Sequence, residues 1–118
     1  MEKSNLIVEK SYAFALDIVK LCFGIQKERR EFVLSRQLLK SGTSIGANVE
    51  EAVGGISKAD FLAKMQIAYK EARESHYWIR LMRDSSLLEE QITHKMINNC
   101  EELIKILSAI LKTGKRVK

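Results

Sequence analysis

Hydrophobic residues recur every three or four positions over most of the chain, a spacing that places them on one face of an α-helix. Four stretches carry this pattern, and short polar or glycine-containing segments separate them. The pattern predicts helices from Ser4 or Asn5 to about residue 28, over about 30–53 and 58–83, and from about residue 88 onward. Long helices joined by short connections predict an all-α fold, an antiparallel up-down-up-down four-helix bundle formed by residues 1–118 as a single domain.

Several residues mark the expected ends of these helices. The pair Gly54 and Gly55 should end the second helix, because glycine readily takes the left-handed conformation that closes helices. Ser57 should cap the third helix, with Asp60 in its first turn. Gly114 is expected to stop the fourth helix and leave residues 113–118 as a frayed basic tail.

Residues 37–55 carry an apolar and a polar stripe side by side. The apolar stripe is Leu38, Gly42, Ile45, Val49 and Ala52. The polar stripe includes Gln37, Ser44, Asn48 and Glu51. Gly42 and Gly46 remove side-chain bulk, which favours the close approach of another helix. The polar stripe is either a solvated edge or a structural hydrogen-bonded network at a helix or subunit junction, and we favour the network because the stripe adjoins the small residues.

The first helix has more apolar surface than a single bundle core requires. One seam consists of Val8, Tyr12, Ala15, Val19 and Cys22, widened by Leu16 and Phe23. A second seam consists of Ile7, Phe14, Ile18, Leu21 and Ile25. This helix either contacts another subunit or occupies a more central place in the bundle.

The overall charge allows an anionic partner without requiring one. The formal net charge is +5 and the sequence pI is about 9.3, values that are also ordinary for a soluble domain. The two cysteines, Cys22 and Cys100, both fall on apolar stripes and are expected to be reduced and buried. The sequence shows neither an export signal nor an apolar run of membrane-spanning length, so we expect a cytoplasmic protein.

The residue pattern argues against an enzyme and against a bound cofactor or metal. A di-iron bundle needs Glu-x-x-His pairs, but Arg73 precedes His76 and Gln91 precedes His94 at that spacing. Two cysteines and two distant histidines do not match a zinc site. Helical-bundle ribonucleases of the higher-eukaryote and prokaryote nucleotide-binding type place arginine four to six residues before histidine, a spacing that Arg73 and His76 do not have.

Basic and aromatic residues share faces of the second and third predicted helices, a combination that can bind phosphate and stack on bases. The candidate nucleic-acid-binding residues are Arg36, Lys40, Lys70, Arg73, Tyr77 and Arg80. The alternative is an ordinary solvated face, because Glu71 and Glu74 dilute its charge and Tyr77 and Trp78 could pack between helices.

Several motifs resemble one family of bacterial proteins. They are Gln37-Leu38, the run Ser44-Ile45-Gly46-Ala47-Asn48-Val49-Glu50-Glu51, Phe61-Leu62, Gln66-Ile67-Ala68 and the downstream Glu74. Together they resemble the four-helix-bundle (S23) proteins encoded in intervening sequences of 23S ribosomal RNA genes. Gly46 stands where that family usually has proline, and Ala52 where it usually has glycine.

The resemblance implies a function that composition alone does not. The family is similar to the accessory variability protein of diversity-generating retroelements, which forms a ring-shaped homopentamer and binds nucleic acid with its reverse transcriptase. It therefore implies a homo-oligomer, with a pentamer as the expected order, and contact with RNA or DNA. By the same analogy, a reverse transcriptase is a candidate partner protein. We predict a non-catalytic oligomeric nucleic-acid-binding protein, with a purely structural or protein-protein assembly module as the alternative.

Overall fold

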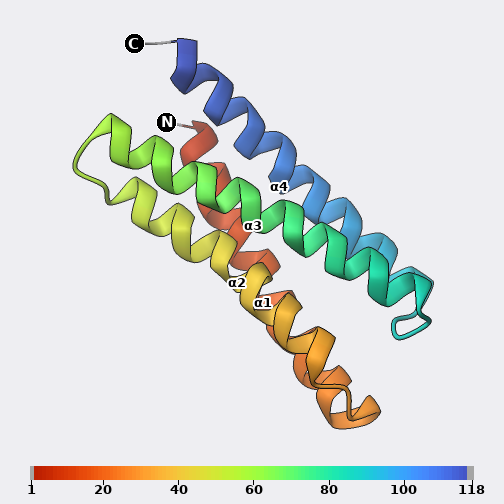
Figure 1. The fold of residues 1–118 in the computed structure, drawn as a ribbon. Coiled ribbons are helices and arrows are strands. Elements are labelled where there is room, and N and C mark those ends of the chain that lie inside the picture. The colour runs from red at the N-terminus through yellow and green to blue at the C-terminus, as the bar shows by residue number, and fades with distance from the viewer. Residues whose placement is uncertain (1, 117–118) are drawn as a thin grey trace.

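The computed structural model describes residues 2–116 of the chain, and the side chains of residues 5–114. Four helices follow one another: α1 (Glu2–Arg29), α2 (Val33–Val53), α3 (Lys58–Asp84) and α4 (Glu90–Arg116). The connections at both ends of the bundle are short, so each helix runs antiparallel to the one before it (Figure 1). The predicted all-α, up-down-up-down bundle is confirmed.

Each helix packs against its sequence neighbours, and α1 also packs against α4. Within the described chain, no Cα atom of α1 lies within 8 Å of one in α3, and the same holds for α2 and α4, so these are the two diagonals of the bundle. The interface between α1 and α4 is the least extensive of the four. The result is a slender molecule of 48 × 21 × 19 Å.

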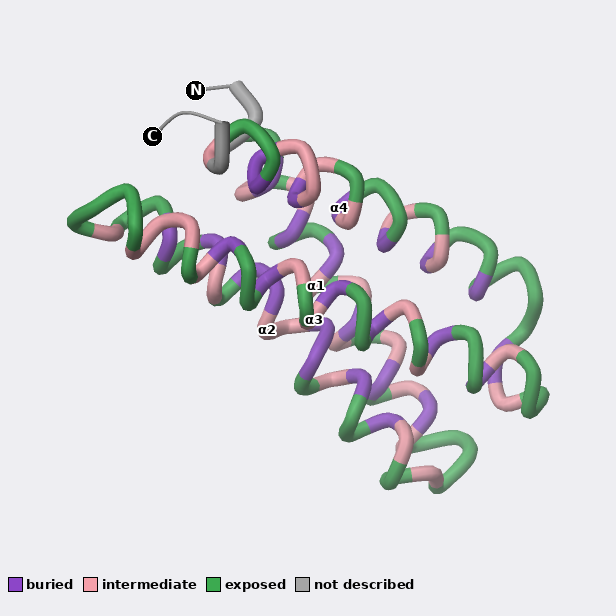
Figure 2. Tube along the Cα trace, turned by 45° about the horizontal axis from the view of Figure 1, so that its top comes forward, coloured by how far each residue is buried: buried purple, intermediate pink, exposed green. Residues whose placement is uncertain are grey.

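The predicted apolar seams form the core, visible as buried stripes along the helices (Figure 2). Every residue of the α2 stripe is buried, and on α3 the buried residues are Met65, Ala68, Ala72, Ser75, Ile79 and Met82. On α4 the helical periodicity predicts Ile92 as the first core residue, followed by Met96 and Cys100, but Ile92 is 38% exposed and Thr93 is buried instead. The Thr93 hydroxyl donates to the backbone oxygens of Glu89 and Glu90, which removes the cost of burying it.

The two seams of α1 have different environments. Ile7, Phe14, Ile18 and Ile25 of the second seam are buried, so this face is the one that packs in the core. From the first seam and the residues that widen it, Cys22 is buried but Tyr12, Leu16 and Phe23 are 67%, 47% and 57% exposed. We call these three residues the outer face of α1. The helix is therefore not central, and its surplus apolar surface faces outward.

The predicted close approach at the α2 glycines is confirmed, and the partner is α1. A Cβ atom on Gly42 would lie 2.9 Å from two carbons of the Ile18 side chain. A Cβ atom on Gly46 would lie 3.4 Å from the backbone oxygen of Ser11, an ordinary contact distance. The absence of a side chain is therefore required by packing at Gly42 and only permitted at Gly46.

The structure confirms where α2 ends and α3 begins, but the backbone conformation at the end of α2 differs from the one predicted. Ser57 caps α3 as predicted, accepting from the backbone N–H of Asp60 at 3.0 Å. Gly54 does end α2, but at φ −84°, and no described glycine has positive φ. Arg30 and Ser86 take the left-handed conformation instead, at φ 55° and 63°.

Two further boundaries differ from the expectation. The helix α1 begins at Glu2, so Ser4 and Asn5 lie within it rather than capping it. The helix α4 continues through Gly114 to Arg116, because glycine weakens a helix without preventing it. Of the expected frayed tail, residues 117 and 118 lie outside the described chain.

The second helix begins at Val33, and the carboxylate of Glu31 caps it. This carboxylate accepts from the backbone N–H groups of Val33, Leu34 and Ser35, each at 2.9 Å. It thereby satisfies three of the donors that a helix start leaves without partners. The cap explains why the helix starts three residues later than the periodicity indicated.

Both cysteines are buried, as predicted. Burial raises the pKa of the Cys22 and Cys100 thiols to about 12, with a smaller contribution from Glu31 and Glu101 respectively. The Cys100 thiol donates to the backbone oxygen of Ala72 at 3.2 Å and thus links α4 to α3. Of the helices described, none is long and apolar enough to span a membrane.

Candidate nucleic-acid interface

The third helix carries a row of basic residues toward α4. Arg73, His76 and Arg80 stand three and four residues apart, so they share one face of the helix. That face lies beside the core seam containing Ala72 and Ile79, whose burial fixes the rotation of α3. Core packing therefore decides which way the basic row points.

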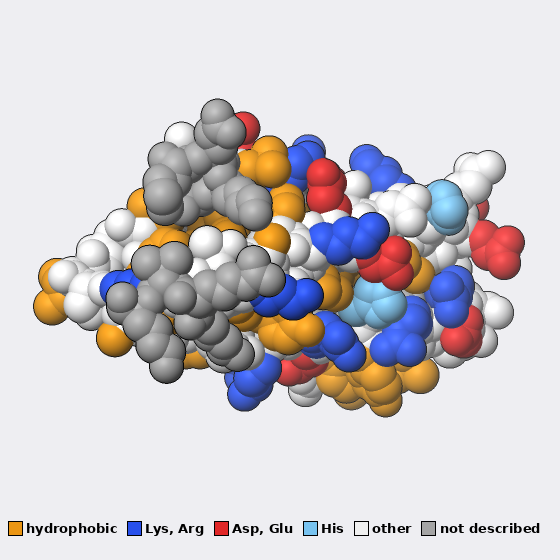
Figure 3. Space-filling view, turned by 90° about the horizontal axis from the view of Figure 1, so that it is seen from above, with side chains coloured by type: hydrophobic (Ala, Val, Ile, Leu, Met, Phe, Trp, Pro, Cys, Tyr) orange, Lys and Arg blue, Asp and Glu red, His pale blue; other side chains and the backbone are white. Residues whose placement is uncertain are grey.

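The row lines an open depression between α3 and α4, which we call the α3–α4 groove. Its lining consists of Arg73, Glu74, His76, Arg80, Glu101 and Ile104. His76 Nε2 lies 3.0 Å from Glu101 Oε2, and this contact joins the two walls of the groove. Figure 3 shows both histidines on one face of the molecule, with Lys or Arg near them and acidic side chains interspersed.

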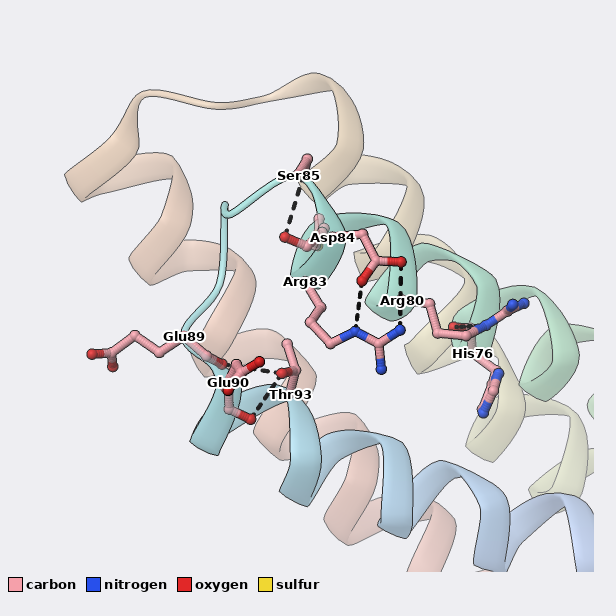
Figure 4. Close-up of polar contacts among 9 residues, drawn as sticks. His76, Arg80, Arg83, Asp84, Ser85, Glu89, Glu90 and Thr93 are labelled. Atoms are coloured by element: carbon pink, nitrogen blue, oxygen red, sulfur yellow. Dashed lines mark hydrogen bonds and ion pairs between the residues drawn. The ribbon is translucent and has the colours of Figure 1, made fainter.

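Neighbouring groups hold the two arginines of the groove without neutralising them. The Arg80 Nε–H donates to the backbone oxygen of His76 at 3.3 Å (Figure 4). The Arg80 guanidinium lies 5.9 Å from the Tyr77 ring centre. Arg73 donates to the Tyr69 hydroxyl at 3.4 Å and lies 6.0 Å from that ring centre. Among the described residues, neither guanidinium forms an ion pair, so both charges can attract an anion.

Two other charged groups at the groove have partners of their own. Arg83 extends the basic row by one turn, but its Nε lies 2.8 Å from the Asp84 carboxylate, which compensates its charge (Figure 4). Glu74 also lines the groove and keeps its negative charge there, because the Trp78 indole N–H that it accepts from at 3.0 Å is a neutral donor. Among the described residues that line the groove, Arg73 and Arg80 are therefore the arginines without an ion pair, and the carboxylates of Glu74 and Glu101 lie in the same lining.

The other predicted basic residues lie outside the groove. Lys40 of α2 and Lys70 of α3 both act on the carboxyl of Glu71, so they flank the boundary between these helices. Burial raises the pKa of Glu71, and Glu74 raises it further, while the two lysines oppose the shift. Arg36 lies near the start of α2 with its guanidinium 5.5 Å from the Phe32 ring centre.

Tyr77 is half exposed and packs edge-on against Trp78, with ring centres 5.1 Å apart. The structure therefore brings together Arg73 and Arg80 with Tyr77 beside them. It places Arg36, Lys40 and Lys70 on other parts of the surface.

The residues of the predicted polar network, Ser44, Asn48, Glu51 and Gln37, do not form one connected set of hydrogen bonds. The Asn48 amide donates to the backbone oxygen of Ser44 at 2.9 Å and to its hydroxyl at 3.1 Å, within α2. Glu51 instead forms an ion pair with Lys64 of α3 at 2.9 Å, and Gln37 is exposed. The buried polar contact between these helices is elsewhere, between the hydroxyls of Ser75 and Ser41 at 2.9 Å.

Sequence reasoning missed the pair that joins the two walls of the groove, His76 and Glu101. His76 could have been found, since it lies between Arg73 and Arg80 at helical spacing. Glu101 could not have been found, because its place opposite His76 depends on the register between α3 and α4.

The fold defines a class: a single-chain antiparallel four-helix bundle with a polar groove between its last two helices. Residues 3–109 match the family described as 23S rRNA-intervening sequence protein. The chain therefore belongs to the 23S rRNA-intervening sequence (S23) protein family, as its motifs indicated.

A solved structure supports the same assignment. The chain is similar to a protein of unknown function from the S23 ribosomal protein family of Bacteroides thetaiotaomicron VPI-5482. The two are 42% identical with a TM-score of 0.91, over 93% of this chain and 98% of the other. No curated protein matches the chain.

Proposed function

We propose that this protein binds nucleic acid without catalysing a reaction, through phosphate contacts in the α3–α4 groove. The observation that carries the proposal is the pair of guanidinium groups of Arg73 and Arg80, which line an open groove and form no ion pair among the described residues. Guanidinium groups present several N–H donors in a plane and match phosphate oxygens well. Contacts of this kind fix the position of a nucleic acid but read no base sequence.

Structured RNA is the first ligand to test. The half-exposed Tyr77 ring beside Arg80 offers a stacking surface for an unpaired base. Five copies in a symmetric ring would carry roughly +25 in net charge, which would strengthen weak contacts by repetition.

Fluorescence anisotropy with a labelled RNA hairpin and a labelled DNA duplex tests this proposal at low and at physiological salt. We expect binding at low salt that weakens steeply as salt rises, because phosphate contacts release counterions. The combination of Arg73→Gln and Arg80→Gln should lower affinity about tenfold or more. The matched control is Arg36→Gln with Lys40→Gln, which removes the same charge outside the groove. Equal losses in the two double variants would move the site elsewhere, and no binding at low salt would refute the proposal.

A second candidate function, self-assembly without nucleic acid, is favoured by the outer face of α1. Tyr12, Leu16 and Phe23 present exposed apolar side chains along one helix face, a feature of surfaces that contact another protein. We propose that a second copy of the chain covers this face in a homo-oligomer, and the family resemblance supports a pentamer.

Light scattering at micromolar concentration tests the assembly. The combination of Leu16→Gln and Phe23→Gln should reduce the particle mass toward that of one chain. The control is Ile67→Gln, at a residue that is 40% exposed on α3. A wild-type monomer would refute self-assembly, and dissociation by Ile67→Gln alone would place the interface on α3.

A further inference from the structure

We propose that Arg73, His76 and Arg80 form a phosphate subsite whose resident anion in the free protein is the Glu101 carboxylate. Glu101 would therefore compete with a bound phosphate and limit affinity. This inference rests on the proposed nucleic-acid binding and assigns one acidic residue of α4 a role in it.

The two partners of the contact across the groove differ in how freely they can move. The His76 side chain is 20% exposed, whereas the Glu101 side chain is 51% exposed. His76 is therefore held largely by its surroundings, while the carboxylate can rotate into solvent without unpacking the core. A phosphate arriving from solvent can displace Glu101 and meet the same imidazole.

The cationic side of the subsite is already in place. Arg80 is anchored to the backbone oxygen of His76, and Arg73 to the hydroxyl of Tyr69. A phosphate placed at His76 would thus lie on the same helix face as both guanidinium groups and lose little affinity to ordering them. Arg83 is excluded from the subsite because Asp84 already compensates it.

Glu101 lowers the affinity for phosphate because both groups are negatively charged. After the phosphate displaces it from the imidazole, the Glu101 carboxylate still belongs to the facing wall of the groove and repels the phosphate. One unit charge at about 4 Å in water changes an equilibrium roughly fivefold. Replacing Glu101 with glutamine keeps the shape of the side chain and removes the charge. The substitution should therefore tighten binding, which few single substitutions outside a binding site would do.

The adjacent residue supplies a matched control. Glu102 is also half exposed, with 49% of its side chain accessible, but it faces α1 and pairs with Lys10 at 3.1 Å. Glu102→Gln changes the net charge of the protein by the same amount as Glu101→Gln. Any effect of overall charge alone must therefore appear in both variants.

The test is anisotropy of a fluorescein-labelled RNA hairpin with wild type, Glu101→Gln and Glu102→Gln at one low salt concentration. We expect about a fivefold tightening for Glu101→Gln and less than a twofold change for Glu102→Gln. Combined with Arg73→Gln and Arg80→Gln, the substitution Glu101→Gln should lose its effect, because the subsite is then absent. Circular dichroism melting of each variant checks that the fold is retained.

The outcomes separate the subsite from the proposed function. Wild-type binding with equal effects of Glu101→Gln and Glu102→Gln would overturn the subsite and leave nucleic-acid binding standing. Weaker binding by Glu101→Gln would also overturn it, since the carboxylate would then support the site. If neither wild type nor Glu101→Gln binds at low salt, both the subsite and the proposed function fail.

Discussion

The α1–α2 junction and the α3–α4 groove lie on different sides of the bundle and have opposite character. At the junction, the Ile18 side chain fills the space above Gly42, and the Gln26 amide donates to the Ser35 hydroxyl at 3.0 Å. In the groove, charged side chains meet across an open surface. Tight apolar packing contributes strongly to stability, whereas exposed ion pairs contribute little. We therefore expect the junction to determine stability and the groove to determine binding.

The largest effect should come from Gly42→Ala at the junction. A methyl group 2.9 Å from two carbons of the buried Ile18 side chain forces a shift in packing, and we expect a destabilisation of about 1–3 kcal/mol. Urea denaturation measures it.

Gly46→Ala is the control for that substitution, because it adds the same methyl group one helical turn away at an ordinary contact distance. We expect it to be neutral or to stabilise the protein by up to about 1 kcal/mol, through the higher helix propensity of alanine. Equal destabilisation by both variants would contradict the difference between the two glycines.

A smaller effect should come from Glu31→Gln, at the start of α2 beside the same junction. Partial burial tends to raise the pKa of the Glu31 carboxyl, but hydrogen bonds from Leu34, Ser35 and Val33 outweigh it and hold the pKa below its usual value. A lowered pKa in the folded state means that the carboxylate stabilises the fold above its unfolded pKa of about 4.3. This contribution is lost as pH falls through the folded pKa.

Urea denaturation of Glu31→Gln at pH 7 and at several lower values measures this contribution. We expect a loss of about 1 kcal/mol at pH 7, the usual size of a helix cap, and a shrinking difference from wild type below about pH 4. Glu28→Gln, an exposed position on α1, should show no such pattern. A difference that stayed constant down to pH 3 would rule out the charged cap.

The smallest effect on stability should come from the groove. We expect Arg73→Gln and Arg80→Gln to change the free energy of unfolding by at most about 0.5 kcal/mol each, because both side chains are exposed. Melting temperature and RNA affinity should therefore respond to different sets of residues. A groove substitution that destabilised the fold as much as Gly42→Ala would contradict the separation of stability in the junction from binding in the groove.

Much of the fold could be predicted because local patterns and packing agree. The 3.6-residue periodicity located four helices and nearly all core positions, and Ser57 capped α3 as expected. The helix ends were less certain, because a carboxylate outside a helix can replace an expected cap, as Glu31 does for α2. Left-handed residues at Arg30 and Ser86 were not predictable, since neither is a residue type that favours this conformation.

The sequence by itself determined the fold class, the family and the close approach at Gly42, because each follows from residue types at fixed spacing along one helix. Only the tertiary structure decided which seam of α1 is buried, since both seams have helical periodicity and the choice depends on its neighbours. It also decided that Arg73 and Arg80 share a groove with Glu101 while Lys40 lies outside it. The register between two helices is set by their packed cores, and no spacing within either helix encodes it.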